Sequence, residues 1–106
     1  MTGDRRQGRR YLVVGTSVIS TSEGQFQADL INLGAGGMLA FCDSSPALGE
    51  EAEVRLQLQD YPLEVQTRAR VLHSAPGLVG LSFLEEAESL EEVLLWLEAG
   101  FLACLI

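Results

Sequence analysis

Short runs of alternating or apolar residues follow one another from Tyr11 onward, separated by turn residues at intervals of roughly ten positions. The separating segments are rich in Gly, Pro, Asp and Ser, which tight turns favour. Strands in series with short turns need no parallel crossover, so the pattern predicts an all-β sandwich or barrel with antiparallel strands. The six predicted strands are Tyr11–Ser20, Gln25–Leu33, Gly37–Cys42, Ala52–Leu58, Leu63–Ser74 and Leu78–Leu84.

Two of these runs predict finer detail. In the run AEVRLQLQ, the alternation places Val54, Leu56 and Leu58 on one face of a strand and polar side chains on the other, as in a strand with one solvated side. Gly80 interrupts the run LVGLSF. A glycine inside a strand predicts a bulge or a close approach of another backbone, which a small closing barrel often needs.

The hydrophobic period changes after Leu84. Ser89 followed by Glu92 has the form of a capping box, and the apolar residues beyond it recur at helical spacing. The pattern predicts one C-terminal α-helix over residues 88–104, whose main apolar stripe holds Leu90, Val93, Leu94, Leu97 and Phe101. Further apolar residues lie off this stripe, so two interpretations stay open. The helix covers an open end of the fold, or it offers a surface for a partner protein or a homodimer.

The chain of 106 residues is long enough for one modest core, and 47% of its residues are hydrophobic. We therefore expect a single domain over residues 1–106, with a flexible arginine-rich arm at 1–10, the strands at 11–85 and the helix at 88–104. No apolar run reaches the roughly 18–20 residues of a membrane span, and the basic N-terminus lacks the apolar core of a secretory signal. The expected location is the cytoplasm.

Residues for metal binding or nucleophilic catalysis are scarce. Cys42 and Cys104 lie far apart with no CxxC or Cys/His spacing, and His73 is the only histidine. Each of the three is expected to be a buried or half-buried residue of the fold. The acidic residues fall in turns and on the polar face of the predicted helix, without a general acid or base partner. The sequence therefore predicts neither an enzyme nor a cofactor or metal site.

Charge is distributed unevenly along the chain. The net charge is −8, yet all seven basic residues are arginines, and four of them fall at positions 5, 6, 9 and 10. With Asp4 the first ten residues carry +3, so residues 11–106 carry −11. A protein that binds DNA or RNA polymers needs a broad basic surface, which this chain cannot supply. A compact anion fits better, because screening over about 8 Å makes nearby arginines count for more than distant carboxylates.

The segment DLINLGAGGMLAF places a glycine-rich turn between two apolar strands. Gly34, Gly36 and Gly37 permit positive φ angles and a close approach of backbone amides to a ligand, so the turn is either an ordinary hairpin or an anion-binding nest. Asn32, just before the turn, carries amide donors and a carbonyl acceptor suited to the edge of a base. Arginine forks bind phosphate and planar acceptor edges and stack on flat rings, so the arm is either a ligand clamp or a solvated tail.

Together the two features resemble the PilZ family of bacterial cyclic di-GMP receptors, whose motifs are RRxxxR before the first strand and [D/N]xSxxG between the second and third. Arg5, Arg6 and Arg10 match the first motif, and Asn32 and Gly37 match the ends of the second. The run RVLHSAPGLVGLSF is similar to the family's last hairpin, and the predicted helix stands where the family has its own. The resemblance covers nearly the whole chain and implies a small six-stranded antiparallel β-barrel with one C-terminal helix.

The resemblance also implies a non-enzymatic receptor for cyclic di-GMP. Arg6 and Arg10, assisted by Arg5, would bind the phosphates and guanine edges of the dinucleotide and stack on its purines. Ligand binding would order the arginine arm across the barrel face. The ordered arm would then signal to an unidentified effector protein in the bacterial cytoplasm.

The second motif has one departure from the family pattern. Asn32 would hydrogen-bond a guanine, and Gly36 and Gly37 would bring the backbone close to the ligand, but Gly34 stands where the family has Ser. A neutral hydrogen bond contributes roughly 0.5–1.5 kcal/mol and each bond to an arginine about 1.5–3 kcal/mol, so we expect weakened rather than abolished binding. The alternative is a degenerate PilZ-like domain that no longer binds nucleotide and acts as a protein-interaction module through its apolar C-terminal helix.

Overall fold

The computed structural model describes residues 9–103. They form the strands β1 (Arg10–Leu12), β2 (Gly15–Thr21), β3 (Gly24–Gly34), β4 (Gly37–Cys42), β5 (Glu51–Leu58), β6 (Val65–Ala75) and β7 (Gly77–Phe83), and the helix α2 (Glu88–Ala103). Arg5, Arg6 and Cys104 lie outside the described residues, as does most of the arm that we expect to be flexible.

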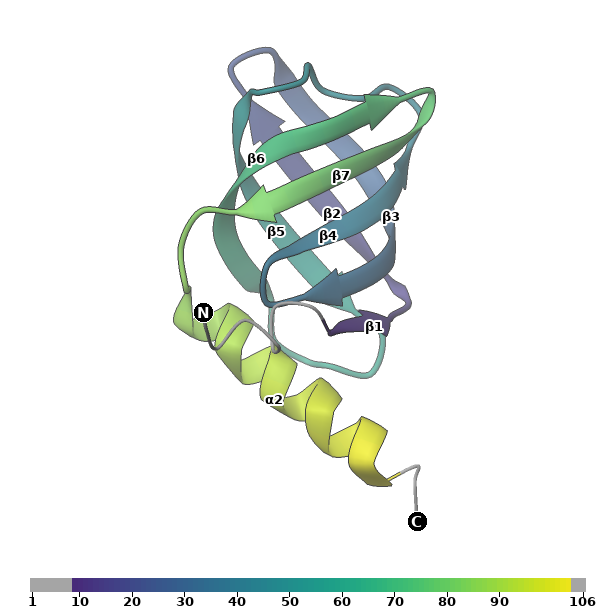
Figure 1. Cartoon of the computed structure of the whole chain (residues 1–106), viewed down its shortest axis with the longest axis vertical. Helices are drawn as coiled ribbons and strands as arrows, with labels where there is room; N and C mark the ends of the chain where they lie inside the picture. The colour runs from purple at the N-terminus through teal and green to yellow at the C-terminus, as the bar shows by residue number, and fades with distance from the viewer. Residues whose placement is uncertain (1–8, 104–106) are drawn as a thin grey trace.

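Six of the strands close into an antiparallel barrel (Figure 1). Their order is β3-β2-β5-β6-β7-β4, and β4 returns to pair with β3. Each of these pairings is antiparallel. The predicted six-stranded antiparallel barrel with one C-terminal helix is confirmed.

The short strand β1 adds to the predicted set. It continues along the edge of β3 beyond the end of β2: β1 reaches Leu12↔Asn32, and β2 starts at Thr16↔Asp29. Residues 13–15, between these two pairs, therefore lie opposite residues 30–31 of β3. The one extra residue forms a bulge that separates β1 from β2. The prediction of one strand over Tyr11–Ser20 is wrong here, because the apolar run continues through the break.

The barrel interior holds the core. Burial alternates residue by residue along β5, where Val54, Leu56 and Leu58 point inward as predicted. The first residues of the neighbouring strand β6 alternate in the same way. Cys42 is also in the core, and its burial raises the pKa of its thiol, so the expected buried cysteine is confirmed at this position.

Gly80 faces a bulge in the neighbouring strand. The register of β6 against β7 shifts between Val71 and His73, which leaves Leu72 as the extra residue. A Cβ on Gly80 would lie 3.1 Å from His73 Cδ2, so the missing side chain gives space to the imidazole ring. A bulge is therefore present in this pairing, but it lies on β6 and not, as the sequence predicts, in the strand that holds Gly80. His73 itself is exposed, contrary to the expectation of a buried or half-buried histidine, because its ring lies on the outer surface of the barrel.

Helix α2 crosses the end of the barrel at which β1 lies (Figure 1). Leu90 and Val93 are buried in the core, so the helix covers this end. The predicted capping box is wrong, because the helix begins at Glu88 and Ser89 lies inside it. The Ser89 hydroxyl instead accepts a hydrogen bond from Gln66 N at 3.1 Å and donates one to Gln66 O at 3.2 Å. This residue therefore ties the helix to β6.

Part of α2 remains apolar and exposed. Leu95 is 70% exposed and Trp96 41%, although the Trp96 ring also packs against Tyr61 with ring centroids 5.0 Å apart. No helix within residues 9–103 combines the length and the apolar character that crossing a membrane requires.

Candidate functional site

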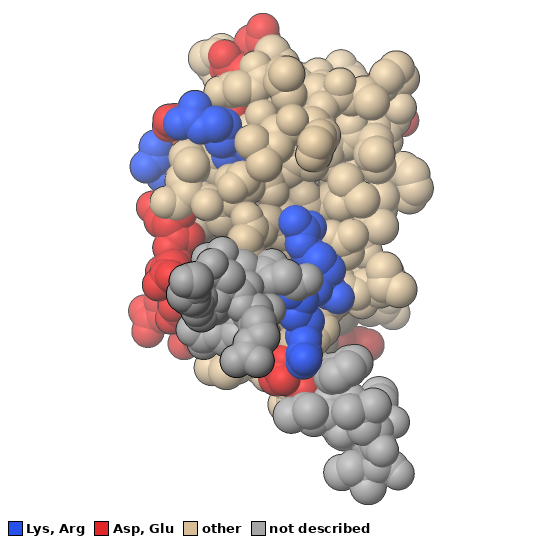
Figure 2. Space-filling view, viewed as in Figure 1, with Lys and Arg blue, Asp and Glu red and all other residues tan. Residues whose placement is uncertain are grey.

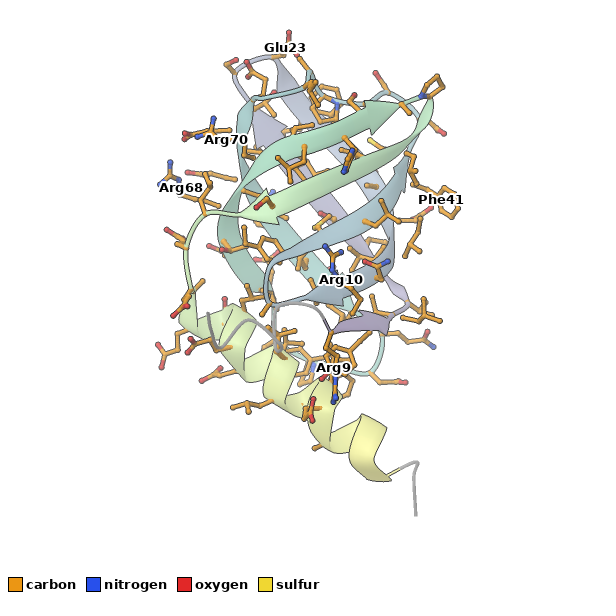
Figure 3. All side chains as sticks on the ribbon, in the orientation of Figure 1. Arg9, Arg10, Glu23, Phe41, Arg68 and Arg70 are labelled. Carbon is orange, nitrogen blue, oxygen red and sulfur yellow. The ribbon has the colours of Figure 1, made fainter. Side chains whose placement is uncertain are left out.

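Strand β1 brings the two sequence motifs together. Its register pairs Arg10 with Gly34 and Leu12 with Asn32, so the last arginine of the arm lies directly beside the start of the glycine turn. Arg10 Nη1 donates a hydrogen bond to Asn32 Oδ1 at 2.8 Å. The side chain of Arg10 lies over the lower part of the barrel wall (Figure 3). Two residues that the sequence selects separately are therefore in direct contact.

Arg10 keeps its positive charge available. It makes no ion pair with any residue in the described part of the chain. By contrast, Arg68 and Arg70 on β6 both pair with Glu51, at 2.9 and 2.8 Å. Figure 2 shows the difference: one strip of basic surface lies where Figure 3 places Arg9 and Arg10, and it borders a broad uncharged surface. An exposed arginine beside uncharged barrel surface is suited to an anion that also carries flat rings.

The glycine turn is a tight hairpin between β3 and β4, closed by Ala35 and Gly36. Gly34, Gly36 and Gly37 do not adopt the positive φ angles that glycine permits, because the glycines with positive φ in residues 9–103 are Gly24, Gly49 and Gly77. The turn is therefore not a nest built on left-handed residues. Gly36 lies at the tip, where its carbonyl accepts a hydrogen bond from Phe83 N at 2.9 Å.

The other two glycines of the turn, Gly34 and Gly37, allow neighbouring strands to approach closely. A Cβ on Gly34 would lie 2.5 Å from the carbonyl oxygen of Arg9 and 2.9 Å from Arg10 Cδ. A Cβ on Gly37 would lie 2.1 Å from the carbonyl oxygen of Leu81. Gly34 therefore admits β1 against β3, and Gly37 admits β4 against β7. The residue that departs from the family motif is the one that lets the arginine strand lie in its place.

The helix is contacted by Tyr11, on the other face of β1, and by Arg9, which directly precedes this strand. Arg9 Nη1 lies 3.1 Å from Glu98 Oε2, and the Tyr11 hydroxyl donates a hydrogen bond to Glu98 Oε1. The hydrogen bond from Tyr11 and the charge of Arg9 lower the pKa of Glu98, whereas burial and the carboxylate raise the pKa of Tyr11. Tyr11 and Glu98 together raise the pKa of Arg9. Glu98 therefore stays ionised and anchors both residues.

The Arg9, Tyr11 and Glu98 cluster was not predicted from the sequence. Strand alternation offers a partial signal, since consecutive residues of a strand point to opposite sides and Arg9 must therefore diverge from Arg10. The partner Glu98 lies 89 positions away along the chain. No local pattern indicates a contact over that separation.

The described residues hold no group of three or more His, Cys, Asp or Glu side chains that could bind a metal ion.

A family model described as the PilZ domain matches residues 4–99. The chain belongs to the PilZ domain family. PilZ domains are in general binding and receptor domains, and nothing in the described residues of this site indicates catalysis.

Solved structures share the fold of this PilZ domain. The PilZ domain of CeSA from a cellulose-synthesizing bacterium is similar, with 17% identity, a TM-score of 0.70, and coverage of 86% of this chain and 99% of that one. The Bacillus subtilis inhibitor of motility, MotI/DgrA, has 23% identity and a TM-score of 0.74 over 93% of this chain and 52% of that one. An uncharacterized Legionella protein has 14% identity and a TM-score of 0.58 over 86% and 91%. At these identities the likeness shows the fold alone. No curated protein gives a match.

Proposed function

We propose that this PilZ domain binds cyclic di-GMP at the barrel surface around Arg10 and Asn32, leaves the dinucleotide chemically unchanged, and passes the binding event to a partner protein in the bacterial cytoplasm. The observation that carries the proposal is the contact of Arg10 with Asn32, 2.8 Å long, between the two family motifs. The family is one of cyclic di-GMP receptors and effectors, and both of its motifs are represented here.

The hydrogen-bonding capacity of the pair fits the ligand. Arg10 uses one of its N–H donors on Asn32 and retains the others for phosphate or a guanine edge. Asn32 accepts from Arg10 through Oδ1, which fixes the amide orientation and leaves both Nδ2 hydrogens for a guanine acceptor. Arg5 and Arg6 complete the arginine motif in sequence and would add further charge-assisted bonds to the ligand.

Binding energy in this proposal comes mainly from the arginines. Each hydrogen bond to an ionised group contributes about 1.5–3 kcal/mol, whereas the serine hydroxyl that Gly34 replaces would contribute roughly 0.5–1.5 kcal/mol. The position of β1 against Gly34 also holds Arg10 beside Asn32 before the ligand arrives, which reduces the entropy cost of binding.

The test is isothermal titration calorimetry with cyclic di-GMP, using GMP and cyclic di-AMP as ligand controls. We expect saturable, selective binding that Arg10→Ala and Asn32→Ala weaken, the first by about tenfold or more. Arg55→Ala is the matched control, since Arg55 is also an exposed strand arginine but lies on β5. Absence of binding at several hundred micromolar ligand, or equal loss in the Arg55→Ala protein, would contradict the proposal.

A second function is favoured by the exposed apolar residues Leu95 and Trp96 of α2. In this alternative the domain binds no nucleotide and acts only as a protein-interaction module. The titration separates the two functions, because a module without nucleotide binding gives no heat with cyclic di-GMP.

A further inference from the structure

A groove separates helix α2 from β1 and from the tip of the β3–β4 turn. Its volume is about 1030 Å³, which reaches the upper end of the roughly 300–1,000 Å³ of small-molecule pockets. The groove therefore has room for several side chains of a peptide. Its apolar lining comes from Phe83, Leu84, Leu90, Leu94 and Leu95. Leu84 and Leu95 are 40% and 70% exposed, so part of this apolar surface faces solvent.

The charged lining of the groove is strongly acidic. Glu85, Glu86, Glu91 and Glu98 line it, and the only basic lining residue within 9–103 is Arg9. Arg9 already pairs with Glu98. The carboxylates of the other three glutamates make no hydrogen bond or ion pair with a residue that the structure describes. Apolar surface beside uncompensated negative charge selects for an occupant that is both apolar and basic.

We infer that this groove docks a basic amphipathic segment of a partner protein. The apolar side chains of that segment would cover Leu84 and Leu95, and its lysines or arginines would face Glu85, Glu86 and Glu91. An amphipathic helix laid in an apolar groove is a recurrent mode of peptide recognition. The inference names the kind of partner that the proposed receptor would signal to, and in that respect it rests on the proposed function.

Two other occupants fit the groove less well. Residues 1–8 of the chain itself supply Arg5 and Arg6, but their only hydrophobic residue is Met1, which leaves most of the apolar lining uncovered. A second copy of the chain would bring its own helix α2, which contains no Lys or Arg, and a net charge of −8. Like charges oppose that association.

The groove shares structural elements with the nucleotide site. Arg9, Tyr11, Ala35 and Gly36 line the groove, while Arg10 and Asn32 lie on the other side of the same strand pair. A ligand that holds Arg10 therefore acts on the strand that forms one wall of the groove. By linkage, any effect of nucleotide on partner affinity has an equal effect of the partner on nucleotide affinity.

The probe that tests the inference is a fluorescein-labelled peptide of about 15 residues, built of leucine and lysine with the leucines at helical spacing. Its counterpart replaces every lysine with glutamate. Binding to the full chain is measured by fluorescence anisotropy without nucleotide, so failure here is distinct from failure of the cyclic di-GMP titration. The groove variants are Glu91→Lys and Leu95→Gln. Their matched controls are Glu92→Lys on the same helix and Leu63→Gln, since both residues are exposed and lie outside the groove.

We expect the lysine peptide to bind, the glutamate peptide not to bind, and each groove variant to weaken binding by about tenfold while each control stays within about twofold. Circular dichroism melting curves establish that the variants are folded. Equal weakening by Glu91→Lys and Glu92→Lys would show non-specific charge attraction and overturn the inference. So would an increase in peptide affinity in an Arg5→Ala, Arg6→Ala protein, which would assign the groove to the chain's own arm. A dimer in sedimentation that Leu95→Gln dissociates would assign it to a second copy.

Discussion

Replacing Gly34 with the serine of the family motif should lower both the stability of this domain and its affinity for cyclic di-GMP. The structure places a Cβ at position 34 only 2.5 Å from the carbonyl oxygen of Arg9 and 2.9 Å from Arg10 Cδ. The nearer atom belongs to the backbone and cannot swing aside as a side chain can. Serine therefore either compresses the β1–β3 pair or displaces the first residues of β1 from β3.

Compression of the β1–β3 pair and displacement of β1 lower the free energy of unfolding by similar amounts. Inserting extra atoms into a well-packed site costs about 1–3 kcal/mol. Detaching this end of β1 gives up the pairing of Arg10 with Gly34 and the hydrogen bond from Arg10 to Asn32, at about 1 kcal/mol for each bond. We therefore expect Gly34→Ser to lower the free energy of unfolding by about 1–3 kcal/mol. For a domain of this size that corresponds to a fall in Tm of about 4–8 °C per kcal/mol.

The effect on ligand affinity should have the same sign. A serine hydroxyl by itself would add roughly 0.5–1.5 kcal/mol and tighten binding by up to about tenfold. Displacement of Arg10 removes at least one charge-assisted bond, worth about 1.5–3 kcal/mol, and this loss is larger. The expected result for Gly34→Ser is weaker binding of cyclic di-GMP.

Calorimetric titration and thermal melting of the same protein samples measure both effects. Gly34→Ala is the matched control, since it adds the Cβ without the hydroxyl. If the close approach of β1 decides the outcome, Ala and Ser lower the melting temperature and the affinity alike. Tighter binding by Gly34→Ser with an unchanged melting temperature would refute the steric explanation and restore the view of Gly34 as a lost hydroxyl.

Three further predictions concern the framework around the site. Ser89→Ala removes two hydrogen bonds to the backbone of Gln66 and should lower the free energy of unfolding, measured by urea denaturation, by about 1–2 kcal/mol. Ser89→Thr keeps a hydroxyl and should lower the free energy of unfolding by less. Glu98 has a lowered pKa, so its contribution to stability is present above its ordinary value of 4.5 and is lost as the pH falls through the lower folded value. The stability difference between wild type and Glu98→Gln should therefore shrink as the pH falls below 4.5, and a constant difference between pH 7 and pH 3 would contradict this cause. Gly37→Ala places a Cβ 2.1 Å from the carbonyl oxygen of Leu81 and should destabilise the barrel by about 3 kcal/mol or more, seen as a lower urea midpoint.

The barrel could be predicted from the sequence because its signals are local. The alternation in β5 records one buried and one solvated face, and the structure reproduces it at every position. Gly80 indicated an irregularity in the right strand pairing, although the bulge itself lies on the partner strand β6. The break between β1 and β2 could not be predicted, since the apolar residues Val13 and Val14 continue the run through it.

Predictions failed where a distant partner decides the local structure. The spacing of Ser89 and Glu92 favours a capping box, but the backbone of Gln66, which lies 23 positions away, takes the serine hydroxyl. The site follows the same rule. The proximity of Arg10 and Asn32 was implied only by the family resemblance, and the partner of Arg9 and Tyr11 on the helix had no sequence signal at all. Contacts between residues so far apart in sequence form only when the barrel closes, so no short segment of the sequence indicates them.

In the proposed function, the small size of β1 would let a small ligand act through this strand. The strand has 3 residues and, among the described strands, pairs with β3 alone, so few backbone hydrogen bonds hold it in place. At about 1 kcal/mol for each bond, the energy that holds β1 is comparable to the 1.5–3 kcal/mol of a single charge-assisted bond from Arg10 to a phosphate. The strands of the barrel are longer and each pairs with at least two neighbours, so many more hydrogen bonds hold them in place. Because alternation places Arg10 on one face of β1 and Tyr11 on the other, in the proposed function a change in how firmly β1 is held would reach Glu98 on helix α2 through the hydrogen bond from Tyr11.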